Sequence, residues 1–151
     1  MAEAWRIVKE KHAAAAFSGE GAAKTGGRWN SRGVAVVYTS CTRSLAVLES
    51  LVHLNPPVAF NYVAIPLKFV DTLIETFRPD NLPADWRSEP PPMATKAIGD
   101  GWVKAARSVV LALPSVITGE TNYLLNPAHP DFKKITIGKQ ERFVFDPRLL
   151  T

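Results

Sequence analysis

The spacing of apolar and polar residues divides the chain into short segments, most of which are typical of β-strands. Residues 4–8 alternate weakly between the two kinds, and residues 34–39 form a short, β-branched apolar run that favours a buried strand. Residues 70–77 are compatible with a strand or with a short helical piece. Further strands are expected at 58–67, at 108–113, and as a final pair, 135–137 with 142–145, around Gly138.

Two segments have the apolar spacing of helices. Thr42 is a suitable cap for a helix that runs to about Leu54, where the sequence Asn-Pro-Pro at 55–57 ends it. A second helix is expected over 94–106. The remaining stretches are expected to be irregular: a glycine-interrupted loop at 9–27, a proline-dense surface excursion at 78–93, and a turn-rich segment at 121–132.

These elements follow no regular alternation of strand and helix. The pattern therefore predicts an α+β fold with a largely antiparallel sheet rather than a doubly wound one. The length of 151 residues fits one domain, which we expect to span residues 1–151. Hydrophobic residues make up 46% of the chain and charged residues 21%, which excludes disorder or a coiled coil for most of it.

The charge balance leaves two kinds of partner open. Eighteen basic residues against fourteen acidic ones give a formal net charge of +4, and such a surplus is found in nucleic-acid-binding proteins. The cations are scattered, however, with tight groupings only at Lys9/Lys11 and Lys133/Lys134. A site for an anionic small molecule explains the surplus equally well.

Cysteine and histidine usage restricts both the compartment and the metal chemistry. The single cysteine, Cys41, excludes an internal disulfide and a cysteine-rich zinc site, and it suits a reducing cytoplasm. With three histidines, a metal site would need carboxylates, and we expect none. No apolar run approaches the roughly 18 residues that a membrane span requires, so no membrane partner is expected.

Several well-known catalytic motifs are missing. Lys24-Thr25 lies in a glycine-rich stretch, but Ala23 stands where a phosphate-binding loop needs glycine. No dinucleotide-binding glycine fingerprint is present. Ser115 has no flanking glycines, so it is not the nucleophile of a strand–turn–helix elbow.

A glycine turn and a strand end supply the first candidate binding residues. Gly26 and Gly27 precede Arg28, whose guanidinium either binds a phosphate or carboxylate or simply lies at the surface of a tight turn. Tyr38 ends the apolar strand at 34–37. Its ring either stacks on a ligand or belongs to the core.

A glutamate and a serine are further candidates, each with a structural alternative. Leu45, Leu48, Leu51 and Val52 define the buried face of the first helix. Glu49 lies about 40° beyond Leu45, where its carboxylate either enters a cleft or pairs with His53 one turn later. Ser115, between apolar residues after a strand, needs a backbone or ligand partner if buried. His129 is either a turn residue or a general base.

Taken in order, these segments resemble the RES domain, a family named for arginine, glutamate and serine. The similarity runs through nearly the whole chain, with no single decisive motif. Ile7 after Arg6 leaves no ring beside that arginine, so Tyr38 is expected to supply stacking alone. The matching stretches are Arg6, Phe17 to Gly21, Gly26 to Asn30, Val37 to Thr39, Leu45 to Leu54, Leu113 to Ile117 and Asn122 to Phe132.

The resemblance implies a fold, an activity and a partner. The fold would be similar to that of ADP-ribosyltransferase toxins: a single compact domain with mostly antiparallel split sheets and flanking helices. The activity would be cleavage of the nicotinamide–ribose bond of NAD, by hydrolysis or phosphorolysis, in the cytoplasm. NAD would be the substrate, with no further cofactor. The partner would be an antitoxin of the Xre helix-turn-helix type, with no direct contact to nucleic acid.

The same resemblance assigns roles to the candidate residues. Glu49 would stabilise the positive charge that develops as the bond breaks, and Arg28 and Arg6 would hold the pyrophosphate of NAD. Tyr38 would stack on nicotinamide, and Ser115 would hydrogen-bond the amide or a ribose. Three other functions stay open at this point: transfer of ADP-ribose to a protein, a basic nucleic-acid-binding or nuclease-type toxin, and nucleotide binding without turnover.

Overall fold

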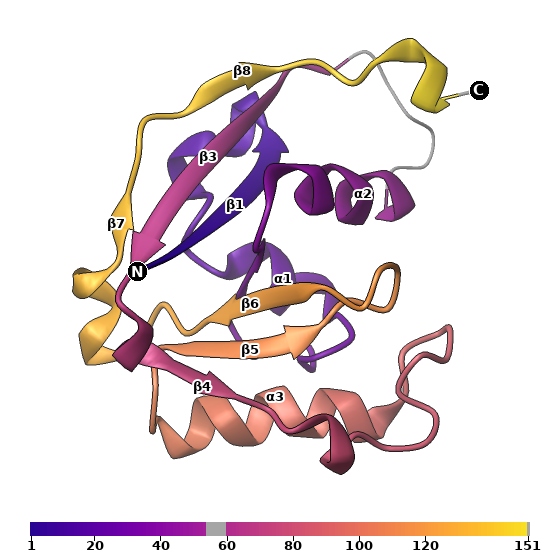
Figure 1. Ribbon diagram of the computed structural model, residues 1–151, viewed down its shortest axis with the longest axis vertical. Helices are drawn as coiled ribbons and strands as arrows, with labels where there is room; N and C mark the ends of the chain where they lie inside the picture. The colour runs from indigo at the N-terminus through magenta and orange to yellow at the C-terminus, as the bar shows by residue number, and fades with distance from the viewer. Residues whose placement is uncertain (54–59, 151) are drawn as a thin grey trace.

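Eight strands are formed by residues 1–53 and 60–150, the part of the chain that the computed structural model describes, and they build one strongly bent sheet (Figure 1). The strand order is β4-β5-β6-β2-β1-β3-β7, and β8 also pairs with β3. The strands are β1 (Ala2–Lys9), β2 (Val37–Ser40), β3 (Tyr62–Phe69), β4 (Ile74–Thr76), β5 (Val110–Pro114), β6 (Thr121–Leu125), β7 (Thr136–Ile137) and β8 (Glu141–Phe143).

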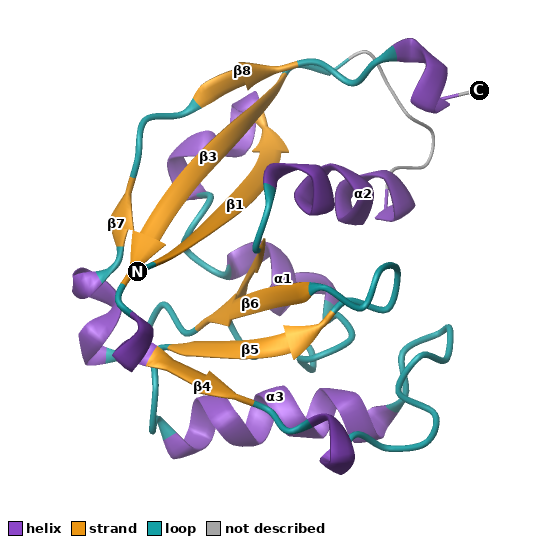
Figure 2. Ribbon diagram, viewed as in Figure 1, coloured by secondary structure: helices purple, strands orange, loops and turns teal. Residues whose placement is uncertain are grey.

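The sheet consists of two halves that meet at one point. One half is β1, β3, β7 and β8, and the other is β2, β4, β5 and β6. Strands β1 and β2 are joined by the single pair Trp5–Ser40, so the halves diverge on either side of it (Figure 2). All pairings are antiparallel except that between β4 and β5. The α+β class and the mostly antiparallel sheet are confirmed, and the two halves remain linked within one sheet.

The long helices are α2 (Arg43–His53) and α3 (Met93–Ala105), and α1 (Glu20–Thr25) is short. The hydroxyl of Thr42 accepts a hydrogen bond of 3.0 Å from the backbone N–H of Leu45, which confirms the predicted cap of α2. Single 3₁₀ turns are η1 (Glu10–Ala15), η2 (Asp71–Leu73), η3 (Pro79–Asn81), η4 (Pro130–Lys134) and η5 (Pro147–Leu150). None of the described helices has the length and hydropathy of a membrane-spanning segment.

The predicted buried face of α2 is only partly correct. Leu45 and Ala46 are buried, but Leu48 is 38% and Val52 62% exposed. The reason is that α2 covers the sheet with one narrow face, and its next face borders an open cleft to which Val52 contributes. This placement leaves the side of α2 that carries Glu49 available to that cleft.

Three other predictions about the elements were wrong. The segment 121–132 contains β6, an interior strand between β5 and β2, whose asparagine and threonine were interpreted as turn residues. The segment 9–27 contains η1 and α1 rather than loop alone. Strands β7 and β8 each pair with β3 instead of with one another. The predicted helix end at Leu54, the proline stop at 55–57 and the strand start at 58 lie outside the described residues.

Two apolar clusters hold the halves of the sheet. One surrounds Phe69 of β3 and Leu125 of β6 and so joins the two halves, and the other packs α3 against β5 and β6 through Trp102, Leu111 and Leu124. Gly99 is the contact point of α3 with the backbone of Trp29, where an added Cβ would overlap the Trp29 carbonyl. The helix therefore fixes the turn that contains Gly26, Gly27 and Arg28.

Candidate active site

A cleft of about 1120 Å³ opens between elements of both halves of the sheet. It is bordered by β1, α1, the glycine turn, β2, α2 and the loop that follows β5. Four of the five predicted site residues line it: Arg6, Arg28, Tyr38 and Glu49. A cavity of this size is sufficient for a ligand as large as a dinucleotide, since small-molecule sites commonly measure roughly 300–1,000 Å³.

Glu49 is held on one oxygen only. Its Oε1 accepts hydrogen bonds from the hydroxyl of Ser115 at 2.7 Å and from the side-chain amide of Asn122 at 3.2 Å. Its Oε2 has no hydrogen-bond partner among the described residues. No ion pair with His53 is formed, so the helical pairing considered above is not the reason for this position. The carboxylate is thus oriented and retains one oxygen for a ligand.

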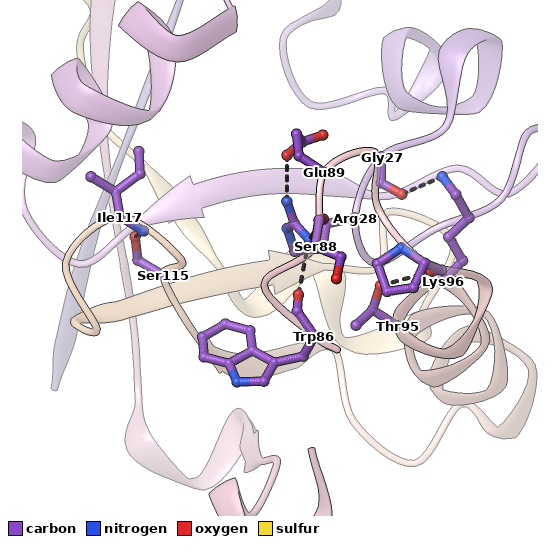
Figure 3. A network of polar contacts seen from close by, with 10 residues as sticks. Gly27, Arg28, Trp86, Ser88, Glu89, Thr95, Lys96, Ser115 and Ile117 are labelled. Atoms are coloured by element: carbon purple, nitrogen blue, oxygen red, sulfur yellow. Dashed lines mark hydrogen bonds and ion pairs between the residues drawn. The ribbon is translucent and has the colours of Figure 1, made fainter. Parts of the chain in front are cut away.

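Ser115 lies behind Glu49 instead of on the wall of the cleft. It is fully buried, and its Oγ accepts a hydrogen bond of 3.1 Å from the backbone N–H of Ile117 (Figure 3). The backbone N–H of Thr118 donates a second hydrogen bond of 3.3 Å to the same oxygen. Because these two donors occupy the lone pairs of the hydroxyl, its proton is directed to Glu49. In this structure the serine positions the glutamate, while its predicted contact with a substrate amide or ribose stays a prediction.

Arg6 brings an uncompensated positive charge into the cleft. Its Nε donates to the carbonyl of Ala16 at 2.6 Å and its Nη1 to the carbonyl of Tyr38 at 2.9 Å. It forms no ion pair with any described residue. Burial of the guanidinium lowers the pKa of Arg6 to about 10. A bound anion would supply the missing counter-charge to the Nη2 amino group, for which the described residues provide no acceptor.

The hydroxyl of Tyr38 is fully engaged by the glycine turn. It donates to Oδ1 of Asn30 at 2.6 Å and accepts from the backbone N–H of Trp29 at 3.1 Å. Burial raises the pKa of Tyr38 well above its usual range. A Cβ on Gly27 would lie 2.6 Å from the same hydroxyl oxygen, so this close approach requires glycine. The hydroxyl is therefore structural, and the ring remains the part of Tyr38 that can contact a ligand.

Arg28 already has partners on the excursion at 78–93. Its Nη1 donates to the carbonyls of Trp86 at 2.9 Å and Ser88 at 2.8 Å, and its Nη2 contacts Oε2 of Glu89 at 2.6 Å (Figure 3). On the other side of the turn, the ammonium of Lys96 donates to the carbonyl of Gly27 at 2.7 Å. Both cations line the cleft, as does Glu89.

The tertiary structure adds residues that the sequence pattern did not identify. Asn122 was read as a turn residue, although its place before two buried leucines is a signal for a strand end. Lys96 is a half-buried residue of α3 and Glu89 lies on the proline-dense excursion, and no local pattern distinguishes them. Counting the described residues that line the cleft, five are lysine or arginine and three are glutamate, which favours an anionic ligand.

His129 is a structural residue. Its Nδ1 accepts from the backbone N–H of Asp131 at 2.9 Å, and its Nε2 lies 3.0 Å from the carbonyl of Ala106. It caps η4 and does not border the cleft. Over residues 1–53 and 60–150, no group of three or more potential ligands is arranged to hold a metal ion.

Comparison with known proteins places this site in context. The RES domain family model matches residues 3–146. The "Prs ADP-ribosylating toxin" of Sphingobium sp. (strain YBL2) is 40% identical over 97% of this chain and 95% of its own. The "Toxin Res" of Yersinia enterocolitica is 37% identical over 96% of this chain and 97% of its own.

A solved structure has the same fold. It is the toxin–antitoxin complex MbcT–MbcA of M. tuberculosis, in which the matched chain gives a TM-score of 0.80 at 14% sequence identity. The match covers 99% of this chain and 86% of that one. The likeness confirms the predicted ADP-ribosyltransferase-like architecture, a single α+β domain with a curled sheet.

Proposed function

The chain belongs to the RES domain family, and from that premise we propose that it is the toxin of a bacterial toxin–antitoxin pair that cleaves the nicotinamide–ribose bond of NAD. The observation that carries the proposal is the asymmetric carboxylate of Glu49. Ser115 and Asn122 hold one oxygen, and the other is unoccupied within the described residues at the wall of a cleft with surplus positive charge.

The chemistry needs a fixed negative charge beside the ribose. When the bond between C1′ and the nicotinamide nitrogen breaks, nicotinamide leaves with the electron pair and C1′ becomes oxocarbenium-like. A carboxylate that is oriented before the reaction stabilises this charge without reorganisation. The acceptor then adds to C1′ and releases its proton to solvent or to the carboxylate. We assign this role to Glu49, and the hydrogen bonds that orient its carboxylate at the cleft support the assignment.

Binding of the remainder of NAD would fall to the cations and the ring on the cleft wall. The uncompensated guanidinium of Arg6 suits one phosphate of the pyrophosphate. Arg28 suits an anion as well, once its contact with Glu89 is exchanged. The ring of Tyr38 would stack on nicotinamide, because its hydroxyl is engaged on the far side.

A purified sample incubated with NAD tests the activity directly. Chromatography should detect free nicotinamide together with ADP-ribose in water, or a phosphorylated ADP-ribose in phosphate buffer. Protein that neither releases nicotinamide nor labels an added extract with ADP-ribose, with phosphate present or absent, contradicts the proposal.

A second candidate is transfer of ADP-ribose to a host protein. The name of the relative from Sphingobium, an ADP-ribosylating toxin, favours it. The same bond breaks in both cases, and the difference lies in the acceptor. Incubation with labelled NAD and a cell extract distinguishes them, because transfer leaves the label on a protein band and hydrolysis leaves it in the small-molecule fraction. The relatives favour this chemistry over a nuclease-type toxin.

We also propose a protein inhibitor, an antitoxin of the Xre helix-turn-helix type. The matched solved structure is a toxin–antitoxin complex, which supports a protein partner for this chain. Coexpression with a neighbouring reading frame of that type should yield a stable complex with little NAD turnover. Separate elution of the two proteins on size exclusion would contradict this part of the proposal.

A further inference from the structure

The ion pair between Arg28 and Glu89 is uneven in its exposure. The side chain of Arg28 is 13% exposed, whereas that of Glu89 is 74% exposed. Among the described residues, the Glu89 carboxylate forms a hydrogen bond with the guanidinium of Arg28 alone. The Glu89 carboxylate can therefore turn into solvent and be hydrated, whereas Nη2 of Arg28 then lacks an acceptor that another anion can supply.

The hydrogen bonds of Arg28 divide into a fixed edge and an exchangeable edge. Both N–H groups of Nη1 are used by the carbonyls of Trp86 and Ser88. One N–H of Nη2 meets Glu89, while the second and the N–H of Nε have no partner within the described chain. If Glu89 leaves, Nη2 and Nε form the two-pronged donor that binds a phosphate bidentately.

We propose that Glu89 is an internal counter-ion that competes with a substrate phosphate for the Nη2–Nε edge of Arg28. This inference rests on the proposed function, since it takes the substrate to be a dinucleotide with a pyrophosphate. On binding, the phosphate replaces the Glu89 carboxylate, and only this side chain moves outward. The excursion itself stays in place, because the carbonyls of Trp86 and Ser88 keep their hydrogen bonds from Nη1 of Arg28. The ring of Trp86 also packs on that of Trp29, with 6.4 Å between the ring centroids.

The competition has a predictable size. An exposed ion pair is weak, so removing the Glu89 charge should strengthen phosphate binding by about two- to fivefold. If Glu89 instead oriented Arg28 for binding, the same substitution would weaken binding. The sign of the change thus decides between the two roles.

Isothermal titration with ADP-ribose, which carries the pyrophosphate but no scissile nicotinamide bond, measures this sign. We expect Glu89→Gln and Glu89→Ala to bind ADP-ribose about two- to fivefold more tightly than the unmodified protein. The control is Glu141→Gln, which removes a half-exposed carboxylate paired with Arg43 at 3.0 Å, away from the cleft, and should leave the affinity unchanged. The gain should vanish when Glu89→Gln is combined with Arg28→Gln.

Three results would overturn the inference. They are equal or weaker ADP-ribose affinity in both Glu89 variants, a gain that persists without Arg28, and no measurable binding in any protein. The proposed function fails separately. Unmodified protein that binds ADP-ribose but never cleaves NAD would contradict the enzyme and leave the exchange intact. NAD cleavage combined with unchanged affinity in the Glu89 variants would contradict the exchange alone.

Discussion

The hydroxyl of Ser115 donates a 2.7 Å hydrogen bond to the carboxylate of Glu49, a residue 66 positions earlier in the chain. The serine directly follows β5 and the glutamate lies on α2, so the bond connects the half of the sheet that contains β5 and β6 with the helix beside the cleft. The buried serine thereby fixes the position of the Glu49 side chain at the wall of the cleft.

Removal of the Glu49 charge should abolish most of the activity. Glu49→Gln keeps the size of the side chain and its hydrogen bond from Ser115. We expect nicotinamide release to fall by roughly 10²–10³-fold, the usual effect of one preorganised electrostatic group, with an unchanged circular dichroism spectrum. The control Glu3→Gln alters an exposed glutamate outside the cleft and should retain full turnover. Turnover at the unmodified rate in folded Glu49→Gln would refute the assignment.

Loss of the Ser115 hydroxyl should affect both stability and the position of Glu49. Ser115→Ala removes a buried hydroxyl that accepts from the N–H groups of Ile117 and Thr118 and donates to Glu49, so we expect the free energy of unfolding to drop by about 1–3 kcal/mol. Because Glu49 then keeps only Asn122, kcat should fall more than KM changes. The exposed Ser44→Ala serves as control in urea titrations and in the NAD assay. A rise in KM alone, with kcat retained, would argue for direct substrate contact instead.

Anion binding should depend on the protonation of Arg6. Arg6→Gln should weaken ADP-ribose binding by roughly 10–100-fold, since it removes a charge-assisted contact. Burial places the pKa of Arg6 at about 10, below its ordinary value, so the affinity of the unmodified protein should decline as pH rises through 10. Titrations between pH 8 and 10.5 should give a shallower decline for Arg6→Gln, and the exposed Arg142→Gln should behave like the unmodified protein.

The same shift has a consequence for stability. The pKa of Arg6 is lower in the folded chain than in the unfolded chain, because burial disfavours the charged guanidinium. Below pH 10 the guanidinium is charged in both states, so its unfavourable contribution to the free energy of folding has its full size there. Above pH 10, its contribution to the free energy of unfolding becomes less unfavourable as the pH rises. A bound phosphate removes this penalty at neutral pH, and ADP-ribose should therefore raise the melting temperature. An absent thermal shift at saturating ADP-ribose would contradict the placement of the anion at Arg6.

The glycine turn should tolerate no added methyl group. In Gly27→Ala the new Cβ would lie 2.6 Å from the Tyr38 hydroxyl and 3.0 Å from Oδ1 of Asn30, so we expect a loss of about 1–3 kcal/mol and weaker NAD binding. Gly101→Ala is the matched control, because Gly101 lies on the exposed side of α3 and no atom lies within 4 Å of a Cβ added there. Its higher helix propensity should stabilise the protein by about 0.5–1 kcal/mol. Equal melting temperatures for the two variants would show that the turn is not tightly packed.

Elements with local signals could be predicted from the amino-acid sequence alone. Thr42 caps α2 as predicted. The predicted segments 4–8, 94–106 and 108–113 correspond to β1, α3 and β5, whose ends differ from the predicted ones by one or two residues. Each depends on side-chain spacing within a few neighbouring residues. The resemblance to a family, carried by the order of the segments, also indicated Arg6, Arg28, Tyr38 and Glu49, which the structure places around one cleft.

The contacts that these residues make depend on the three-dimensional fold and could not be predicted from local sequence. Strand β6 was missed because its polar start resembles a turn, and its interior position depends on hydrogen bonds to β2 and β5. Arg28 obtains its partners 58 to 61 residues later in the chain, and Ser115 reaches Glu49 across 66. Such pairings depend on how the sheet bends and where the helices pack against it. No periodicity within a segment encodes them.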